Sequence, residues 1–83
     1  MNEPQPLIQI LEEYFDLRDL SRAQRTRIGQ LVADIWRWEN DGEYPPPSYY
    51  INKRGARERK GYGYTRSDLM LIEQILRQEK MIQ

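Results

Sequence analysis

The stretch from Trp36 to Thr65, WRWENDGEYPPPSYYINKRGARERKGYGYT, decides how this chain is divided. It begins with aromatic and acidic residues, passes through Asn40-Asp41-Gly42 and the prolines at 45–47, and continues as a basic, tyrosine-rich segment. Glycine often ends a helix in a left-handed conformation, and proline can neither continue a helix nor serve in a central strand. The stretch therefore predicts a helix that ends near the glycine and a different kind of element after the prolines.

The basic segment at residues 48–65 admits two structural interpretations. Tyrosines lie near both of its ends, and Gly55 and Gly61 bracket a charged centre. Aromatic residues beside a glycine-containing turn favour two short strands around a basic loop. Apolar and polar residues alternate poorly, however, and this fits an irregular loop equally well. The sequence leaves both interpretations open.

Apolar residues before this segment recur at the three- and four-residue spacing of helices. They predict helices over residues 6–17 and 21–40, and Ser21 is a suitable N-cap for the second. Gly29 lies inside the second pattern, where glycine weakens a helix by up to about 1 kcal/mol relative to alanine. That helix is therefore predicted either to be continuous or to break near Gly29.

A capping-box pattern follows the basic segment, with Thr65 and Asp68 three residues apart. It predicts a third helix over residues 66–80. This helix carries more apolar side chains than one narrow contact needs, so either the other helices wrap around it or it also forms a homodimer. The apolar residues in question are Leu69, Met70, Leu71, Ile72, Ile75 and Leu76.

With 83 residues, the chain has room for one small domain. Residues 1–6 contain two prolines and little to bury, so we expect a disordered N-terminus there. Residues 7–83 are expected to form a single, mainly α domain. Its three helices would be accompanied by a basic, hairpin-like loop at 48–65, between the second and third helices.

The composition excludes several classes of function. Without cysteine or histidine, the chain lacks disulfides, the usual zinc ligands and the commonest acid–base catalyst. No apolar run approaches the roughly 18 residues that span a bilayer, and the N-terminus lacks the order of a signal peptide. We therefore expect a soluble, cytoplasmic protein that is not an enzyme, needs no metal or cofactor and has no membrane partner.

The net charge is zero, but the charge is unevenly distributed. Residues 1–48 carry five Lys/Arg against nine Asp/Glu, a net −4, and residues 67–83 carry a net −1. Residues 49–66 carry six Lys/Arg against one glutamate, a net +5. Such a cluster binds phosphates by releasing their counterions. A nucleic acid is therefore the favoured partner. There are two alternatives. Either the partner is an acidic protein surface, or the segment is a solvated loop that pairs with the acidic first half of the same chain.

The aromatic residues are open to two roles. Trp38 lies on the apolar stripe of the second helix and is predicted to belong to the core, whereas Trp36 is predicted to lie at the core edge or to make contacts. About half of the segment's tyrosines are expected to pack beneath it, and the others are free to stack on bases or to hydrogen-bond to phosphates. These tyrosines are Tyr49, Tyr50, Tyr62 and Tyr64.

Two motifs resemble MerR-like and AlpA/excisionase-like winged-helix DNA-binding domains. Residues 35–47, IWRWENDGEYPPP, are similar to the end of that family's recognition helix, and residues 63–69, GYTRSDL, to the segment that opens its next helix. The resemblance covers residues 35–69. It implies a winged-helix-like fold in which the second helix enters the major groove and the basic wing holds flanking phosphates or the minor groove. The family has two short helices where residues 21–40 form one long pattern.

Together these observations predict a DNA-binding regulator or an excisionase-like accessory factor, with RNA as a variant partner. The competing hypothesis is an interaction module, a subunit or inhibitor that docks its basic aromatic loop on an acidic protein. Basic residues of the loop would hold the backbone, two tyrosines would buttress the loop or stack, and arginines of the second helix would add a second strip. The predicted binding residues are Lys53, Arg54, Arg57, Arg59, Lys60, Tyr62, Tyr64, Arg66 and Arg37, and the second strip comprises Arg22, Arg25, Arg27 and Arg37.

Overall fold

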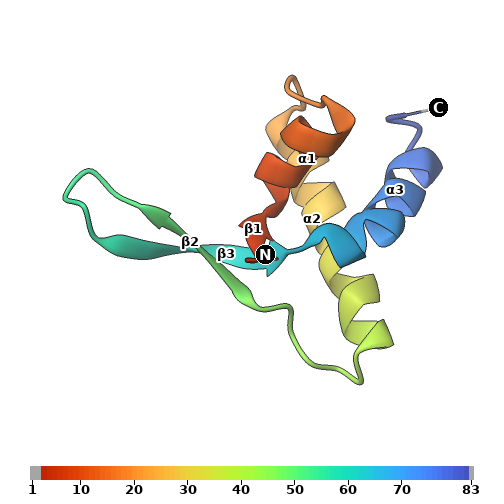
Figure 1. The fold of residues 1–83 in the computed structure, drawn as a ribbon. Coiled ribbons are helices and arrows are strands. Elements are labelled where there is room, and N and C mark those ends of the chain that lie inside the picture. The colour runs from red at the N-terminus through yellow and green to blue at the C-terminus, as the bar shows by residue number, and fades with distance from the viewer. Residues whose placement is uncertain (1–2, 83) are drawn as a thin grey trace.

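The computed structural model describes residues 3–82 and shows three helices beside a three-stranded antiparallel sheet. The helices lie together on one side of the molecule, and a two-stranded hairpin extends away from them (Figure 1). The fold is therefore a mixed helix-and-strand globule rather than a mainly α one. In chain order its elements are β1 (Gln5–Pro6), α1 (Leu7–Phe15), α2 (Arg22–Glu39), β2 (Pro47–Ile51), β3 (Arg57–Tyr64), a 3-10 turn (Arg66–Asp68) and α3 (Leu69–Gln78).

Local signals placed the ends of α2 correctly. Ser21 caps the helix by accepting a hydrogen bond from the backbone N–H of Gln24 at 3.1 Å, and the Gln24 side chain accepts one from the Ser21 N–H at 2.8 Å. Gly42 ends it with a φ of 83°, and its N–H donates to the carbonyl of Arg37. The helix is continuous through Gly29, so the break considered as an alternative does not occur.

The basic segment forms strands, as one of the two interpretations predicted. Strand β3 is central in the sheet, with β2 on one side and the short β1 on the other. The disordered N-terminus predicted for residues 1–6 is wrong for β1, because Gln5 pairs with Tyr64 and Pro6 with Gly63. No local pattern announces this pairing, since its partner lies almost 60 residues along the chain. Met1, Asn2 and Gln83 lie outside the described residues.

The core lies where the three helices meet the end of β3. Among the described residues, Tyr64 is the one residue of the sheet that is buried in this core, so the root of the hairpin is anchored to the helices. Asp68 strengthens this junction, because its carboxylate accepts hydrogen bonds from the Thr65 backbone N–H at 2.9 Å and from the Trp36 indole N–H at 3.2 Å. The buried core residues are Ile10, Leu11, Ile28, Val32, Tyr64, Ile72, Ile75 and Leu76.

The prediction for the tryptophans is wrong in one respect. Trp38 is 83% exposed, whereas Trp36 is half-buried, packs against the core and donates to Asp68. Both residues lie near the end of α2, and two positions along a helix correspond to about 200° around its axis, so the two rings point to nearly opposite sides. Within residues 3–82, none of the helices has the length and apolar character needed to cross a membrane.

Candidate nucleic-acid interface and an adjoining groove

The tip of the hairpin is organised by Asn52. Its side-chain oxygen accepts hydrogen bonds from the backbone N–H groups of Arg54 and Ala56, both at 2.9 Å. Gly55 supplies the left-handed conformation that the turn needs, with a φ of 80°. The turn therefore holds Lys53 and Arg54 at the far end of the hairpin, where both are exposed.

Strand pairing places the remaining cations on both faces of the hairpin. Tyr49 lies opposite Arg59 and Ile51 opposite Arg57, so these four side chains share one face. The guanidinium of Arg57 lies 4.3 Å from the centre of the Tyr49 ring. On the other face, the ammonium of Lys60 lies 5.6 Å from the centre of the Tyr50 ring. An exposed cation–π contact contributes about 0.5–1 kcal/mol. The rings thus orient these cations without neutralising them.

The chain itself does little to neutralise this charge. Within the described residues, the only ion pair of the hairpin joins Arg57 to Glu3 at 3.8 Å, and both side chains are mostly exposed. Such exposed pairs stabilise proteins by about 0–1 kcal/mol. Glu58 instead accepts hydrogen bonds from the Asn52 amide at 2.8 Å and the Tyr50 hydroxyl at 3.3 Å, and its charge raises the pKa of Tyr50. The pairing with the acidic first half of the chain, considered above as an alternative, is limited to one weak contact.

A β-bulge separates the exposed part of the hairpin from its root. Between the paired positions Pro47–Tyr62 and Tyr49–Arg59, β3 has one more residue than β2. Gly61 takes a left-handed conformation there, with a φ of 83°, as bulges commonly require. The environment of β3 differs on the two sides of the bulge. Residues 57–61 are exposed, whereas residues 63–64 are buried.

The predicted tyrosines divide as expected between surface and interior. Tyr49 and Tyr50 are 42% and 43% exposed, whereas Tyr64 is 2% exposed. Burial raises the pKa of the Tyr64 hydroxyl well above the ordinary value. Tyr62 packs against the core and stacks on Tyr44, with ring centres 5.9 Å apart. Tyr64 therefore serves as a buttress and is not available for stacking.

The structure does not bring all predicted binding residues together. The five cations from Lys53 to Lys60 share the hairpin, whereas Arg66 opens the 3-10 turn before α3. Arg27, predicted for a second strip, donates from its Nη2 to Glu79 at 3.3 Å and is also held by that carboxylate through Nε. This pairing lowers the pKa of Glu79 through the hydrogen bond from Arg27 and ties α2 to the end of α3. Arg27 is thereby engaged within the protein.

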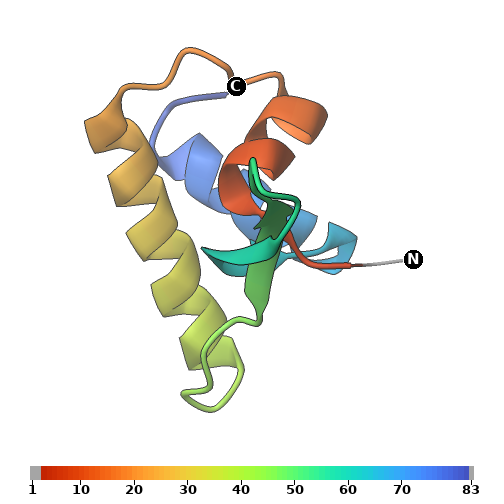
Figure 2. The same cartoon turned by 90° about the vertical axis from the view of Figure 1, so that its left-hand side faces the viewer.

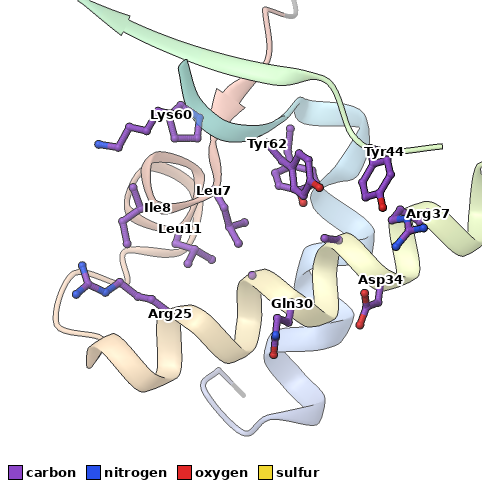
Figure 3. A pocket seen from close by; sticks show the side chains of 14 residues that line it. Leu7, Ile8, Leu11, Arg25, Gln30, Asp34, Arg37, Tyr44, Lys60 and Tyr62 are labelled. Carbon is purple, nitrogen blue, oxygen red and sulfur yellow. The ribbon is translucent and has the colours of Figure 1, made fainter. Parts of the chain in front are cut away.

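Arg37 lies in a second feature, an open groove between α1, α2 and β3 (Figure 3). We call it the α1–α2 groove. Its volume is about 620 Å³, and residues Leu7, Ile8 and Leu11 of α1 lie along one side of it. The guanidinium of Arg37 lies 4.1 Å from the centre of the Tyr44 ring, and its Nε is buried without a hydrogen-bond partner among the described residues. The lining is completed by Pro6, Arg25, Gly29, Gln30, Ala33, Asp34, Lys60, Tyr62 and Tyr64.

Sequence reasoning missed this groove and the contribution of Tyr44 to it. The available signal was Gly29, a glycine in the middle of a helix that no turn or cap requires.

Within residues 3–82 the structure shows no cluster of acidic, cysteine or histidine side chains able to hold a metal ion. Comparisons with protein-family models, curated proteins and solved structures found no match to this chain.

Proposed function

We propose that this protein is a small, non-enzymatic DNA-binding protein whose β2–β3 hairpin holds the phosphate backbone. The observation that carries the proposal is a projecting hairpin with exposed cations that its own chain leaves largely unneutralised. Nothing in the packing of the domain needs these charges, because the hairpin lies outside the core. Their role is best explained by a partner that carries negative charge. The cations are Lys53, Arg54, Arg57, Arg59 and Lys60.

The shape of the hairpin supports a duplex as the partner. Paired strands lie about 4.8 Å apart, and the major groove of B-DNA, about 12 Å wide, admits a two-stranded ribbon. Arginines can bind phosphate oxygens with two parallel hydrogen bonds. The exposed Tyr49 and Tyr50 add hydroxyl donors to the same surface.

We also propose that the domain is winged-helix-like and acts in the cytoplasm as a regulator or an excisionase-like factor. The order of elements supports this: α2 ends at a glycine, prolines lead into a hairpin, and a Thr65-capped turn opens α3. The continuous α2 differs from the two short helices of the family. Since Arg27 is bound to Glu79 and Arg37 lies against Tyr44, we assign phosphate binding to the hairpin and no base recognition to α2.

Salt-dependent binding to a labelled duplex tests the proposal. Each phosphate contact adds about −0.9 to the slope of log K against log salt, so at least three contacts should give a slope of roughly −3 or steeper. Replacing Arg54, Arg57 and Arg59 together by alanine should weaken binding at least tenfold and flatten the slope by about 3. Fluorescence anisotropy at about 50–300 mM salt would measure both quantities.

A control variant with three substitutions outside the hairpin distinguishes the loss of hairpin contacts from the loss of net charge as the cause of weaker binding. Replacing Arg18, Arg77 and Lys80 by alanine removes the same charge outside the hairpin and should change the affinity less than threefold. Equal losses in the two triple variants would contradict the proposal. So would the absence of duplex binding at the lowest salt concentration.

The competing function is docking of the hairpin on an acidic protein, and one observation favours it. Ile51 is 67% exposed beside Tyr49 and Tyr50, an apolar and aromatic combination that is common at protein interfaces. The Ile51→Ser variant distinguishes the two functions, because phosphate binding should be nearly unchanged by it. Comparing duplex DNA, duplex RNA and single strands in the same assay identifies which nucleic acid the hairpin prefers.

A further inference from the structure

The α1–α2 groove has an open apolar floor whose depth depends on small residues of α2. Gly29 and Ala33, one helical turn apart, line it from α2, and the buried Leu11 and Tyr64 lie deeper. A Cβ added at Gly29 would meet no atom within 4 Å. Packing therefore does not require glycine there, although glycine weakens a helix interior. Because Gly29 lines the groove together with Leu7 and Leu11, the absence of a side chain at Gly29 leaves space open in it.

Positive charge lies at both ends of this floor. Arg25 and Lys60 lie near Ile8 at one end, and Arg37 lies beside Tyr44 at the other (Figure 3). Among the described residues that line the groove, Asp34 is the only acid. A buried donor without a partner is costly, and the Nε of Arg37 is such a donor. The Arg37 side chain is only partly buried, however, so a carboxylate brought by a ligand can pair with the charge of its guanidinium.

From this combination we propose that the α1–α2 groove docks an acidic, amphipathic segment of a partner protein. Apolar side chains of the segment would cover the floor, and carboxylates would meet Arg37 at one end and Arg25 with Lys60 at the other. Lys60 is the one residue that this site shares with the cations of the hairpin, among the described residues that line the groove, and the inference does not depend on the binding of DNA.

The spacing of the cations favours a polypeptide over a small molecule. Arg25 and Arg37 are twelve residues apart on α2, which places their backbones roughly 18 Å apart at a rise of 1.5 Å per residue. A small molecule with a single carboxylate cannot reach both ends, whereas a helix of about thirteen residues can. A nucleic acid is also a poor occupant, because its phosphates would lose hydration over Leu7, Ile8 and Leu11.

Selection from a randomised library of 16-residue peptides on phage tests this assignment. The wild-type chain is the target, and the Gly29→Leu variant, whose side chain fills the groove, removes peptides that bind elsewhere. The expected result is a set of enriched peptides with apolar residues at helical spacing and acidic residues near both ends. Synthetic copies should shift the amide signals of Leu7, Gly29 and Ala33 in NMR spectra. If the selection yields no peptide that discriminates between the two proteins, the proposal is wrong.

Matched variants then test the two parts of the site with one enriched peptide. Binding should weaken at least tenfold in Gly29→Leu and in Arg37→Gln, and less than twofold in Ala23→Leu and Arg22→Gln, which alter exposed α2 positions outside the lining. Gly29→Leu should melt no lower than wild type and should bind duplex DNA as wild type does. Peptide binding that survives Gly29→Leu would overturn the assignment. So would weaker binding of duplex DNA by Gly29→Leu, because the floor of the groove would then belong to a nucleic-acid site.

Discussion

Gly63 lies where three segments of the chain approach one another most closely. A Cβ at this position would lie 2.5 Å from the Cβ of Pro4 and 3.1 Å from the Cβ of Ser48. Neither neighbour ends in a flexible side chain that moves easily aside. Gly63 therefore permits the contact between β1 and the root of the hairpin.

The Gly63→Ala variant should be destabilised by about 1–3 kcal/mol, as is typical of overpacked sites. Gly29→Ala provides the opposite control, since it meets no atom and should stabilise the helix by up to about 1 kcal/mol. Urea denaturation of both variants measures the two changes. A Gly63→Ala variant as stable as wild type would mean that β1 is not held against β3.

The two tryptophans should differ sharply in their contributions to stability. Trp36→Ala removes a packed ring and its hydrogen bond to Asp68, and should cost roughly 3 kcal/mol, the low end for truncation of a buried aromatic residue. Trp38→Ala removes an exposed ring and should change stability by less than about 0.5 kcal/mol. Thermal or urea unfolding of the two variants compares them directly. The reverse order would contradict the orientation of α2 described above.

Periodicity alone could not predict which of the two tryptophan side chains is buried and which is exposed. Trp38 continues the stripe that includes Leu31 and Ile35, yet its ring is exposed. Trp36 turns inward because Asp68, at the start of α3, offers an acceptor for its indole N–H. Its burial depends on a residue 32 positions away, which no local pattern contains.

The helices were predictable because their signals are local, whereas the hairpin was one of two interpretations that the sequence left open. Ser21, Gly42 and Thr65 mark ends within a few residues, and the glycines bracket the turn of the hairpin. Strand β1 and the α1–α2 groove were not predictable, since both arise from segments that meet only after folding. The cations of the hairpin were predictable as a cluster, whereas the separation of Arg37 and Arg66 from it was not.

The contact between α2 and the end of α3 makes stability depend on pH. Arg27 lowers the pKa of Glu79 in the folded protein, so folding favours the ionised carboxylate. The resulting stabilisation is complete above the unfolded-state pKa, about 4.3, and is lost as the pH falls through the lower folded-state pKa. The urea midpoint of wild type should therefore exceed that of Glu79→Gln by a constant amount from about pH 5.5 to 7 and by less below about pH 4.

A control variant isolates this ion pair from general acid effects. Glu43→Gln changes an exposed acid in the turn after α2 and should differ little from wild type across the same range. An unchanged difference between wild type and Glu79→Gln at about pH 3 would contradict the account. It would mean that Glu79 acts through packing rather than through its charge.

The net charge of the molecule is zero, but its positive and negative charges lie in different parts of the fold. The helical body carries the core and most of the acidic residues, while the hairpin carries the concentrated positive charge and extends away from the body (Figure 1). In the view from the side of the hairpin, the helices lie behind it (Figure 2). This arrangement lets one domain present two surfaces that meet at Lys60. The proposed phosphate-binding hairpin needs no core beneath it, and the proposed peptide groove needs the packed helices.

The most direct test of the central claim is an NMR titration of the isotope-labelled protein with a duplex of about 20 base pairs at low salt. We expect the largest changes in amide signals on residues 49–60, with small changes in α1 and α3, and we expect added salt to reverse them. Changes concentrated on the helices, or none at all, would contradict the assignment of the hairpin as the DNA-binding surface.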